Sequence, residues 1–527
     1  MTPTEDHSHQ ASLLTHLTAE VPGSVLDQEG LAANLSCPST CLESAVAILV
    51  VGGYALAGIV VEADGDGWLL RYPFVEVADA GQIDLLVAVG EGQAIPSISQ
   101  LVFSADWQER EVEDLFGLQF AGHPLLGDFA LHNEDWPEGV APMRQAAGDL
   151  IMPSPKARAP WRPTRVVESA GAFSMSVGPV FSGVAESVQF RLESEGEEIL
   201  NGVARLFYKY RGLERIAEGR QLRDVVLLAE RLNGSAAFAH GLALCQAAEA
   251  LSQTVVPERA QQLRVVFAEV ERLRSHTSQI ADLAESTGLA VPTALLSSIV
   301  EDLLRLSQVA SRHRYLMGVV CPGGLTIDLG PGSAERLGSG ADRASAALIK
   351  VVQQLERDNG FLDRVEQVGI LTSTTARHYG VVGPMGRASG VGGDLRTAHP
   401  YAAYKEAAVR VAGAEEGDAY ARLRVLVAEA MESSRLITQG IARLAPGPVQ
   451  VDWRPAAGAA LGWVEAPAGA AFHWLRLDAL GTVQRWRVMP GSFTNWHALT
   501  PLVEGFSFQD FPIILASLGL SVAESDR

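Results

Sequence analysis

Cysteine is scarce in this chain of 527 residues, which has four: Cys37, Cys41, Cys245 and Cys321. Four scattered thiols are too few to serve as a disulfide scaffold, so a reducing, cytoplasmic compartment is expected. No C-x-x-C pair occurs, so we expect no iron–sulfur cluster on this chain. Cys37 and Cys41 form a lone pair, whereas a structural zinc site needs about four ligands. Cys245 lies among Ala and Leu and is expected to be a small core residue.

Basic residues are also in short supply, with 41 Lys and Arg against 62 Asp and Glu and a net charge of −21. The chain has no excess of cations to neutralise phosphates, so we expect no nucleic acid partner and no direct binding to an anionic membrane surface. A basic protein partner stays compatible with this charge. A solvated acidic surface is the simpler interpretation.

Long apolar runs are almost missing, and the exception is the uncharged stretch from Ser44 to Val61. A transmembrane helix of roughly 18 residues would fit this length. However, the stretch is rich in Val and Ile and is interrupted by Gly52 and Gly53, which favours two buried strands joined by a glycine turn. Residues 1–10 lack the basic and apolar regions of a signal peptide. Any membrane association is therefore expected to be indirect.

Nucleotide-binding motifs are absent as well. The glycine-rich stretch at 380–386 does not have the G-x-G-x-x-G pattern between a strand and a helix, and no G-x-x-x-x-G-K-[ST] loop occurs. The sequence therefore predicts no nucleotide-binding site on this chain.

Changes in composition and hydrophobic pattern predict four segments. They are a leader at 1–39, an α+β domain at 40–144, an extended linker rich in Pro and Arg at 145–167, and a mainly α-helical domain with small β elements at 168–527.

Short apolar or alternating runs at 59–61, 68–72 and 83–89 predict strands in the first domain, with a turn at 64–67. In the second domain, apolar residues recur at helical spacing over 265–283, which predicts a helix.

The motif E-R-E-x-x-D-x-F-G-x-x-F-x-G-H-P runs from Glu109 to Pro124. It predicts a helix ending near Phe116, where Gly117 suits the C-terminal cap. Its charges are expected to serve capping and interface contacts rather than catalysis. This long motif resembles the signature of the 30-kDa (C-type) subunit of respiratory complex I.

Further blocks in the second domain resemble the 49-kDa (D-type) subunit of complex I and the large subunit of [NiFe] hydrogenases. They include patterns close to A-E-x-x-R-x-x-S-H and G-P-x-x-R-A-S-G. The blocks are Gly178 to Phe190, Tyr208 to Glu214, Ala268 to His276, Gly383 to Gly390, Asp394 to Tyr401, Gly417 to Ser433 and Glu465 to Gly469.

Two segments resemble the metal-binding halves of a hydrogenase large subunit, E-R-x-C-G-x-C and S-L-D-P-C-x-x-C-x-x-R. Here they are the first segment, 230–236, and the second segment, 517–527. The resemblance places the four ligand positions at Asn233, Ala236, Ser521 and Glu524. A nickel–iron centre needs soft thiolate ligands and none of these residues is Cys, so nickel–iron is not expected. The sequence ends at Arg527, so an extension of the kind that many hydrogenase precursors lose on metal insertion is not expected.

The resemblance to the D-type subunit also bears on quinone binding. In that family a His and a Tyr hold the quinone head group, and the matching positions here are Phe181 and Gly234. Both polar groups that would contact a quinone carbonyl are gone, so the family's quinone pose is not expected. A quinone in another pose stays open.

The resemblance predicts that polar residues converge around the vacated pocket. Four of them, Glu214, His240, Arg231 and Arg387, are the candidate proton-relay or pocket residues. The simpler interpretation is a buried ion-pair network that only orders the pocket. The other members expected there are Asn233, Ser235, Ser521, Glu524 and Asp526.

These observations predict a fused C/D-type subunit of a complex I-like or energy-converting hydrogenase-related complex, peripheral on the cytoplasmic face of the cell membrane. Expected partners are a small subunit with the iron–sulfur clusters, a ferredoxin-like subunit and membrane-arm subunits. Three functions stay open: electron transfer coupled to proton movement, a catalytically silent scaffold for the small subunit, and quinone reduction in a non-standard pose. Residual hydrogenase activity would require nickel.

Overall fold

The computed structural model describes most of the chain. The described residues are 3–27, 32–77, 81–127, 129–132, 136, 140–144, 167, 171–181 and 186–527. The linker predicted at 145–167 lies outside them except for Val167.

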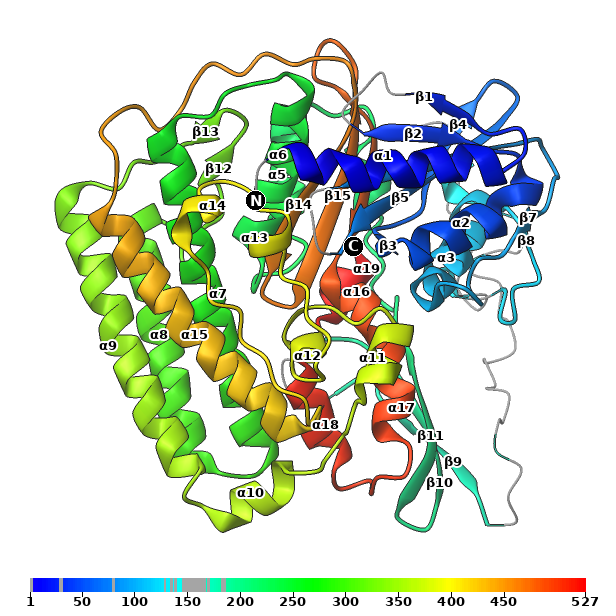
Figure 1. Cartoon of the computed structure of the whole chain (residues 1–527). Helices are drawn as coiled ribbons and strands as arrows, with labels where there is room; N and C mark the ends of the chain where they lie inside the picture. The colour runs from blue at the N-terminus through cyan, green and yellow to red at the C-terminus, as the bar shows by residue number, and fades with distance from the viewer. Residues whose placement is uncertain are drawn as a thin grey trace.

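The N-terminal unit is a mixed sheet covered by helices, drawn in blue to cyan in Figure 1. The strand order is β1-β2-β6-β5-β3, with β4 also paired to β5; β2 runs parallel to β6 and the other pairs are antiparallel. The strands are β1 (Val25–Asp27), β2 (Ala33–Ser36), β3 (Tyr54–Leu56), β4 (Val60–Asp64), β5 (Gly67–Glu76) and β6 (Gln82–Val89). The helices are α1 (Pro3–Glu20), α2 (Leu42–Val51) and α3 (Asp106–Phe116), and the short strands β7 (Ile95–Pro96) and β8 (Phe120–Ala121) pair with each other.

The segment predicted as a leader carries α1, β1 and β2. Leu17 and Leu35 are fully buried, and Leu14 is nearly so, in the same apolar core as the sheet. The described part of residues 1–39 is therefore integrated with the N-terminal unit.

The prediction of two strands between Ser44 and Val61 is wrong in its first half. Residues 42–51 form the helix α2, whose end is marked by the amide of Gly52 donating to the carbonyl of Ile48. A short apolar run does not distinguish a buried helix from a buried strand. The strand was predicted here because the run is rich in Val and Ile, which are typical of strands. The second half is extended, in β3 and β4. No helix within the described parts of the chain is long and apolar enough to cross a membrane.

Other local predictions are confirmed. Asp64 and Gly67 pair across the β4–β5 hairpin. Helix α3 ends at Phe116, and Gly117 has φ 65°, the left-handed conformation that glycine adopts without strain.

The second unit is mainly helical and is built around long helices with three small sheets. The helix predicted over 265–283 is confirmed and extended as α7. The long helices are α6 (Ala237–Leu251), α7 (Glu258–Ser286), α8 (Ala290–Ser311), α9 (Pro331–Leu355) and α15 (Ala419–Ala442). The strands are β9 (Phe173–Val177), β10 (Gln189–Glu195) and β11 (Glu198–Arg205), then β12 (Val320–Cys321) with β13 (Gly324–Leu325), and β14 (Gly458–Ala466), β15 (Gly469–Leu477) and β16 (Val483–Met489).

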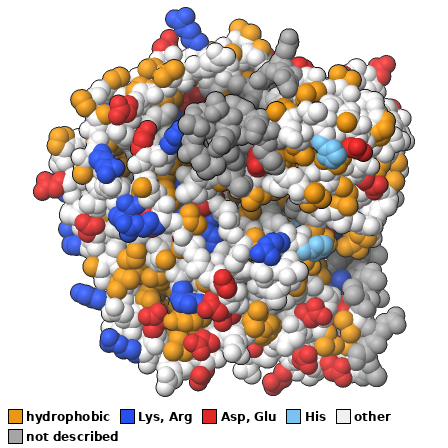
Figure 2. All heavy atoms as spheres, in the orientation of Figure 1, with side chains coloured by type: hydrophobic (Ala, Val, Ile, Leu, Met, Phe, Trp, Pro, Cys, Tyr) orange, Lys and Arg blue, Asp and Glu red, His pale blue; other side chains and the backbone are white. Residues whose placement is uncertain are grey.

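Short helices complete the second unit. They are α4 (Leu213–Ala217), α5 (Leu222–Ala229), α10 (Asn359–Val365), α11 (Ser373–His378), α12 (Gly383–Arg387), α13 (Leu395–Ala398), α14 (Tyr404–Ala407), α16 (Gly491–Asn495), α17 (Leu499–Val503), α18 (Phe511–Leu518) and α19 (Val522–Asp526). On the face drawn in Figure 2, outside the grey region, acidic and basic side chains are interspersed, so this face offers no continuous basic stripe.

The sheet β14–β15–β16 lies between α6 and the N-terminal unit, and it positions the candidate site. Helix α6 packs against β14 and β15. Gly462 allows the close approach, because a Cβ there would lie 2.0 Å from the carbonyl oxygen of Ala243 on α6. Gly462 pairs with His473 on β15, so His473 stands where helix and sheet are closest.

The two units share a polar interface with an aromatic contact. Asp106 accepts a hydrogen bond from His497 at 3.0 Å, and Glu62 pairs with Arg476. The rings of Trp107 and Phe493 meet with centroids 5.7 Å apart.

Leu17→Ala tests whether α1 belongs to the folded core. The fully buried side chain leaves a cavity when truncated, so we expect the free energy of unfolding of the whole chain to fall by about 2–5 kcal/mol. Urea denaturation measures it. The neighbouring exposed His16→Ala is the control and should cost little. Equal stabilities of the two variants would show that α1 does not contribute to the core.

Candidate functional site

The first and second segments are connected through the helices that follow or contain them. The first leads into α6, with Ala236 at the N-cap position, and the second carries α19, with Ser521 at the N-cap position. His240 on α6 joins Glu524 on α19, with Nε2 of the imidazole 2.8 Å from Oε1 of the carboxyl group.

The four positions that match hydrogenase ligands are engaged locally. Asn233 Oδ1 accepts from the amide of Ser235 at 3.0 Å, and the methyl group of Ala236 is buried. Ser521 Oγ accepts from the amide of Glu524 at 3.1 Å and donates to Glu186 at 2.9 Å. Within the described ranges, no group of three or more His, Cys, Asp or Glu side chains is placed to hold a metal ion.

A buried chain of side chains continues from Glu524 into the sheet. His240 Nδ1 lies 3.0 Å from His473 Nε2, and Trp486 donates from Nε1 to His473 Nδ1 at 3.2 Å. Both histidines and Glu524 are fully buried, and so is Trp486. Burial, with a smaller contribution from His240, holds the pKa of His473 well below its ordinary value.

Only one carboxyl oxygen of Glu524 makes a hydrogen bond to the described residues. Oε1 meets His240, while Oε2 is buried and has no hydrogen-bond partner among the residues that the structure describes. A buried polar atom without a partner costs free energy, which makes this oxygen notable.

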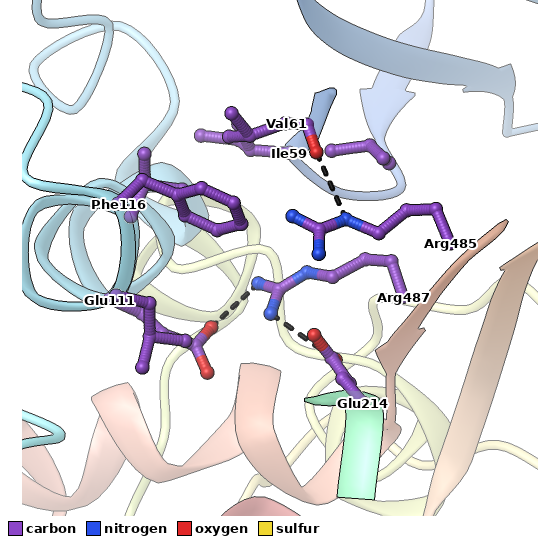
Figure 3. A pocket seen from close by; sticks show the side chains of 10 residues that line it. Ile59, Val61, Glu111, Phe116, Glu214, Arg485 and Arg487 are labelled. Atoms are coloured by element: carbon purple, nitrogen blue, oxygen red, sulfur yellow. Dashed lines mark hydrogen bonds and ion pairs between the residues drawn. The ribbon is translucent and has the colours of Figure 1, made fainter. Parts of the chain in front are cut away.

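Glu214 lies in a different network, at the junction of the two units (Figure 3). Its Oε1 accepts from the amide of Val488 at 3.0 Å, and lies 3.4 Å from Nη1 of Arg487 and 3.2 Å from Nε of Arg527. Glu111 on α3 pairs with both arginines. Burial alone would raise the pKa of Glu111, but Arg487 and Arg527 outweigh it and lower that pKa.

A small cavity lies beside this network. Its volume is about 10 Å³, room for roughly one water molecule. Apolar side chains of β4 and α3, among them Val61 and Phe116, line one side, and Glu111, Glu214, Arg485 and Arg487 line the other, as Figure 3 shows.

Side-chain alternation along β16 separates the two networks. Trp486 and Arg487 are neighbours in one strand, so their side chains point to opposite faces of the sheet. Trp486 reaches the histidines, and Arg487 reaches Glu111 and Glu214. His240 and Glu214 therefore belong to separate networks and do not form one pocket.

Arg387 on α12 lies in a third, fully buried network. Its guanidinium donates to Glu429 at 2.7 Å and to Glu465 at 2.8 Å. These carboxylates outweigh the effect of burial and raise the pKa of Arg387. The network continues through Asp394, Arg396, Glu269, Arg272, His276 and Tyr404.

The predicted convergence fails outright for Arg231. Its side chain is exposed, and its Nη1 donates to the carbonyl of Leu227 one turn back along the chain, at 2.7 Å.

Asp526 is buried and accepts from the amides of Phe207 and Lys209. Burial, offset in part by these bonds, raises the pKa of Asp526 to about 6.

Residues that the sequence interpretation left without a role hold the segments together. Arg211 donates to the carbonyls of Arg231 (2.7 Å) and Leu232 (3.0 Å) in or beside the first segment, and to that of Ala523 (2.5 Å) in the second. Arg211 lies inside a quoted motif, but sequence spacing carries no information on contacts with residues more than 300 positions away.

Glu271 fixes the start of α6. It accepts from the amides of Phe238 and Ala239 at 2.8 and 2.9 Å, and such groups at a helix N-terminus have no partner within the helix. Burial, opposed by the nearby Arg274, raises the pKa of Glu271 to about 7. Arg274 donates to the carbonyl of Gly234 at 2.8 Å, so α7 holds both the first segment and the start of α6.

Comparisons with known proteins match three parts of the chain to three protein families. Residues 42–148 match the respiratory-chain NADH dehydrogenase 30-kDa subunit family, 287–457 and 449–527 match the 49-kDa subunit family, and 211–283 match the nickel-dependent hydrogenase family. Formate hydrogenlyase subunit 5 of Escherichia coli is 30% identical over 440 residues, covering 82% of this chain and 77% of that protein.

The chain belongs to the family of fused 30/49-kDa (C/D-type) complex I subunits and formate hydrogenlyase-type large subunits. Hydrogenase-4 component G of Escherichia coli is 28% identical over 83% of this chain and 76% of that protein. The C/D subunit of NADH-quinone oxidoreductase from Acidiphilium cryptum is 26% identical over 87% of this chain and 85% of that protein. The predicted fold class, a mixed-sheet 30-kDa-like unit before a mostly helical 49-kDa-like unit, is confirmed.

Glu271→Gln tests the buried carboxyl group at the start of α6. With a raised pKa, the folded chain holds this proton between about pH 4.5 and 7 while the unfolded chain releases it, so Glu271 makes the free energy of unfolding fall as pH rises through that window. Gln does not titrate, so the variant should show a shallower fall. Urea denaturation across this window measures the slope. Glu258→Gln, exposed on the same helix, should leave the slope unchanged; a Glu271→Gln slope equal to wild type would refute the assignment.

Proposed function

We propose that this chain is the C/D-type subunit of a membrane-associated, complex I-like or energy-converting hydrogenase-related oxidoreductase complex. It takes part in electron transfer coupled to proton movement, without a nickel–iron centre. The observation that carries the proposal is that one chain joins the 30-kDa-like and 49-kDa-like units, as the name of the C/D subunit of NADH-quinone oxidoreductase implies for that relative.

The donor set does not fit nickel–iron. The positions that match its ligands carry an amide, a methyl group, a hydroxyl and a carboxyl group, whereas that centre requires soft thiolates. Cys245 lies buried on α6 and Cys321 lies in β12, both outside the two segments. The hydrogen bond between His240 and Glu524 supports a site that works without nickel.

The partners follow from what this chain does not supply. With no C-x-x-C pair, its electrons would come through an iron–sulfur small subunit and a ferredoxin-like subunit. Attachment to membrane-arm subunits would hold it at the cytoplasmic face of the cell membrane as a peripheral subunit.

Glu214 is the group we propose for proton handling. It is a buried carboxyl group next to a cavity that accommodates about one water molecule, and water beside a carboxylate is a usual route for protons. A scaffold role is the second candidate, favoured by the matched charges in this network. Glu111 and Glu214 face Arg487 and Arg527, a set that could serve only to join the two units.

One observation supports the third candidate, a quinone in a non-standard pose. Gly234 stands where the family's quinone-binding Tyr would be, and the ring of Tyr315 lies 3.5 Å from the position of a Cβ at Gly234. Tyr315 could therefore offer a hydroxyl group to the same region from another part of the chain.

Metal analysis of the purified complex tests the absence of nickel–iron. We expect nickel far below one atom per chain, because no thiolate pair is available at the two segments, while iron from the partner clusters is retained. Inductively coupled plasma mass spectrometry measures both metals. Stoichiometric nickel would contradict the proposal and would favour hydrogenase activity instead.

Glu214→Gln separates the redox function from the scaffold. If Glu214 carries protons, the variant should assemble normally but lose at least about tenfold in turnover, since positioned proton transfer typically contributes 10²–10⁴-fold. Turnover is measured on the intact complex with NADH, formate or H₂ as donor, whichever the wild type oxidises. Glu218→Gln makes the same change one turn away at a half-buried residue paired with Arg215 and Arg485, and is the control. Unchanged turnover in Glu214→Gln would favour the scaffold.

A further inference from the structure

The buried chain from Trp486 to Glu524 has a fixed direction. It joins β16, β15, α6 and α19 through three contacts between polar atoms of 3.2, 3.0 and 2.8 Å. The ring centroids of His240 and His473 lie 5.2 Å apart. The ring centroids of His473 and Trp486 lie 5.8 Å apart. All four side chains are buried, so water does not compete for these bonds.

The indole end decides where each proton lies. An indole N–H only donates, so Nδ1 of His473 must accept from Trp486. Burial keeps His473 neutral, and a neutral imidazole with an accepting Nδ1 carries its hydrogen on Nε2. That hydrogen points at Nδ1 of His240, which must therefore accept, and the hydrogen of His240 is left on Nε2, facing Glu524.

We infer that Trp486 locks His473 and His240 in their Nε2–H tautomers, so that His240 is a fixed hydrogen-bond donor to Glu524 and not a proton carrier. His240, His473 and Trp486 are thus positioning residues. They present Glu524 with Oε1 occupied and with Oε2, buried and unpartnered within the described residues, as the group left to act.

A proton relay through His240 would break this arrangement. A proton added at Nδ1 of His240 would meet the Nε2–H of His473, which would have to move its hydrogen to Nδ1. There it would face the N–H of Trp486, and the indole does not release its proton at physiological pH. The chain is closed at this end. The tautomer assignment does not depend on the proposed function. The consequence that protons are carried by Glu214 and not by His240 does rest on it.

The full chain, labelled with ¹⁵N-histidine, tests the tautomers directly by long-range ¹H–¹⁵N correlation spectra. We expect both histidines to show a protonated Nε2 and a bare Nδ1, and we expect the His473 signals to stay unchanged across roughly pH 6–8, where a free imidazole titrates. His240→Gln and His473→Gln assign the signals. A Nδ1–H tautomer of either residue, or a titration of His473 in this window, would overturn the inference, whatever the complex turns over.

Trp486→Phe removes the donor that sets the direction. We expect the His473 signals to show a second tautomer or a protonated form in this variant. Trp496→Phe is the matched control, because the Trp496 indole is also buried but donates to the carbonyl of Ser521 and not to a histidine. Unchanged histidine signals in a folded Trp486→Phe chain would contradict the lock. If that variant does not fold, the wild-type spectrum alone decides.

Turnover of the intact complex distinguishes positioning from relay. The amide of His240→Gln can place an N–H near the position of Nε2 but cannot carry a proton, whereas His240→Ala loses the bond to Glu524. A positioning role predicts several-fold more turnover in His240→Gln than in His240→Ala. Equal loss in both would refute it, while the tautomers and the effect of Glu214→Gln are read out separately.

Discussion

The alternation of side chains along β16 is the constraint on which the arrangement of the site depends. Successive residues of this strand face opposite sides of the sheet: Trp486 meets the histidines next to α6, and Arg487 meets the carboxylates next to the N-terminal unit. A shift of register by one residue would exchange these faces and put a guanidinium against His473. The strand thus keeps the hydrogen-bonded chain of Trp486, His473 and His240 apart from the ion pairs of Arg487.

Buried charge is the second organising feature, and it is compensated in separate places. Arg387 is neutralised inside the second unit, by Glu429 on α15 and Glu465 on β14, and Arg487 and Arg527 are neutralised at the junction of the two units. Removing one partner of such a set strands a charge away from water, which commonly costs about 3–5 kcal/mol. These pairings resist rearrangement. Glu524, which has one oxygen without a partner among the described residues, is therefore less constrained than the carboxylates paired with Arg387, Arg487 and Arg527.

Local patterns were predictable from the sequence, and long-range pairings were not. The end of α3 at Phe116 and the long helix α7 follow from spacing and from Gly117. Part of helix α2 was mistaken for a strand because a short apolar run fits either structure. Motif resemblance pointed to the two segments, which Arg211 connects in the structure. It could not find His473, which lies 233 residues from His240 on a strand with no motif of its own, nor place Arg231 outside the pocket, since exposure depends on packing.

Gly462 gives this site a dependence on backbone spacing alone. The strand β14 touches the backbone of α6 at this residue, where even a methyl group would overlap the carbonyl oxygen of Ala243. Ala243 lies three residues beyond His240, and Gly462 pairs with His473. The distance between the two imidazoles is therefore set by how closely α6 approaches the sheet at Gly462. A residue without a side chain thus controls the contact between His240 and His473.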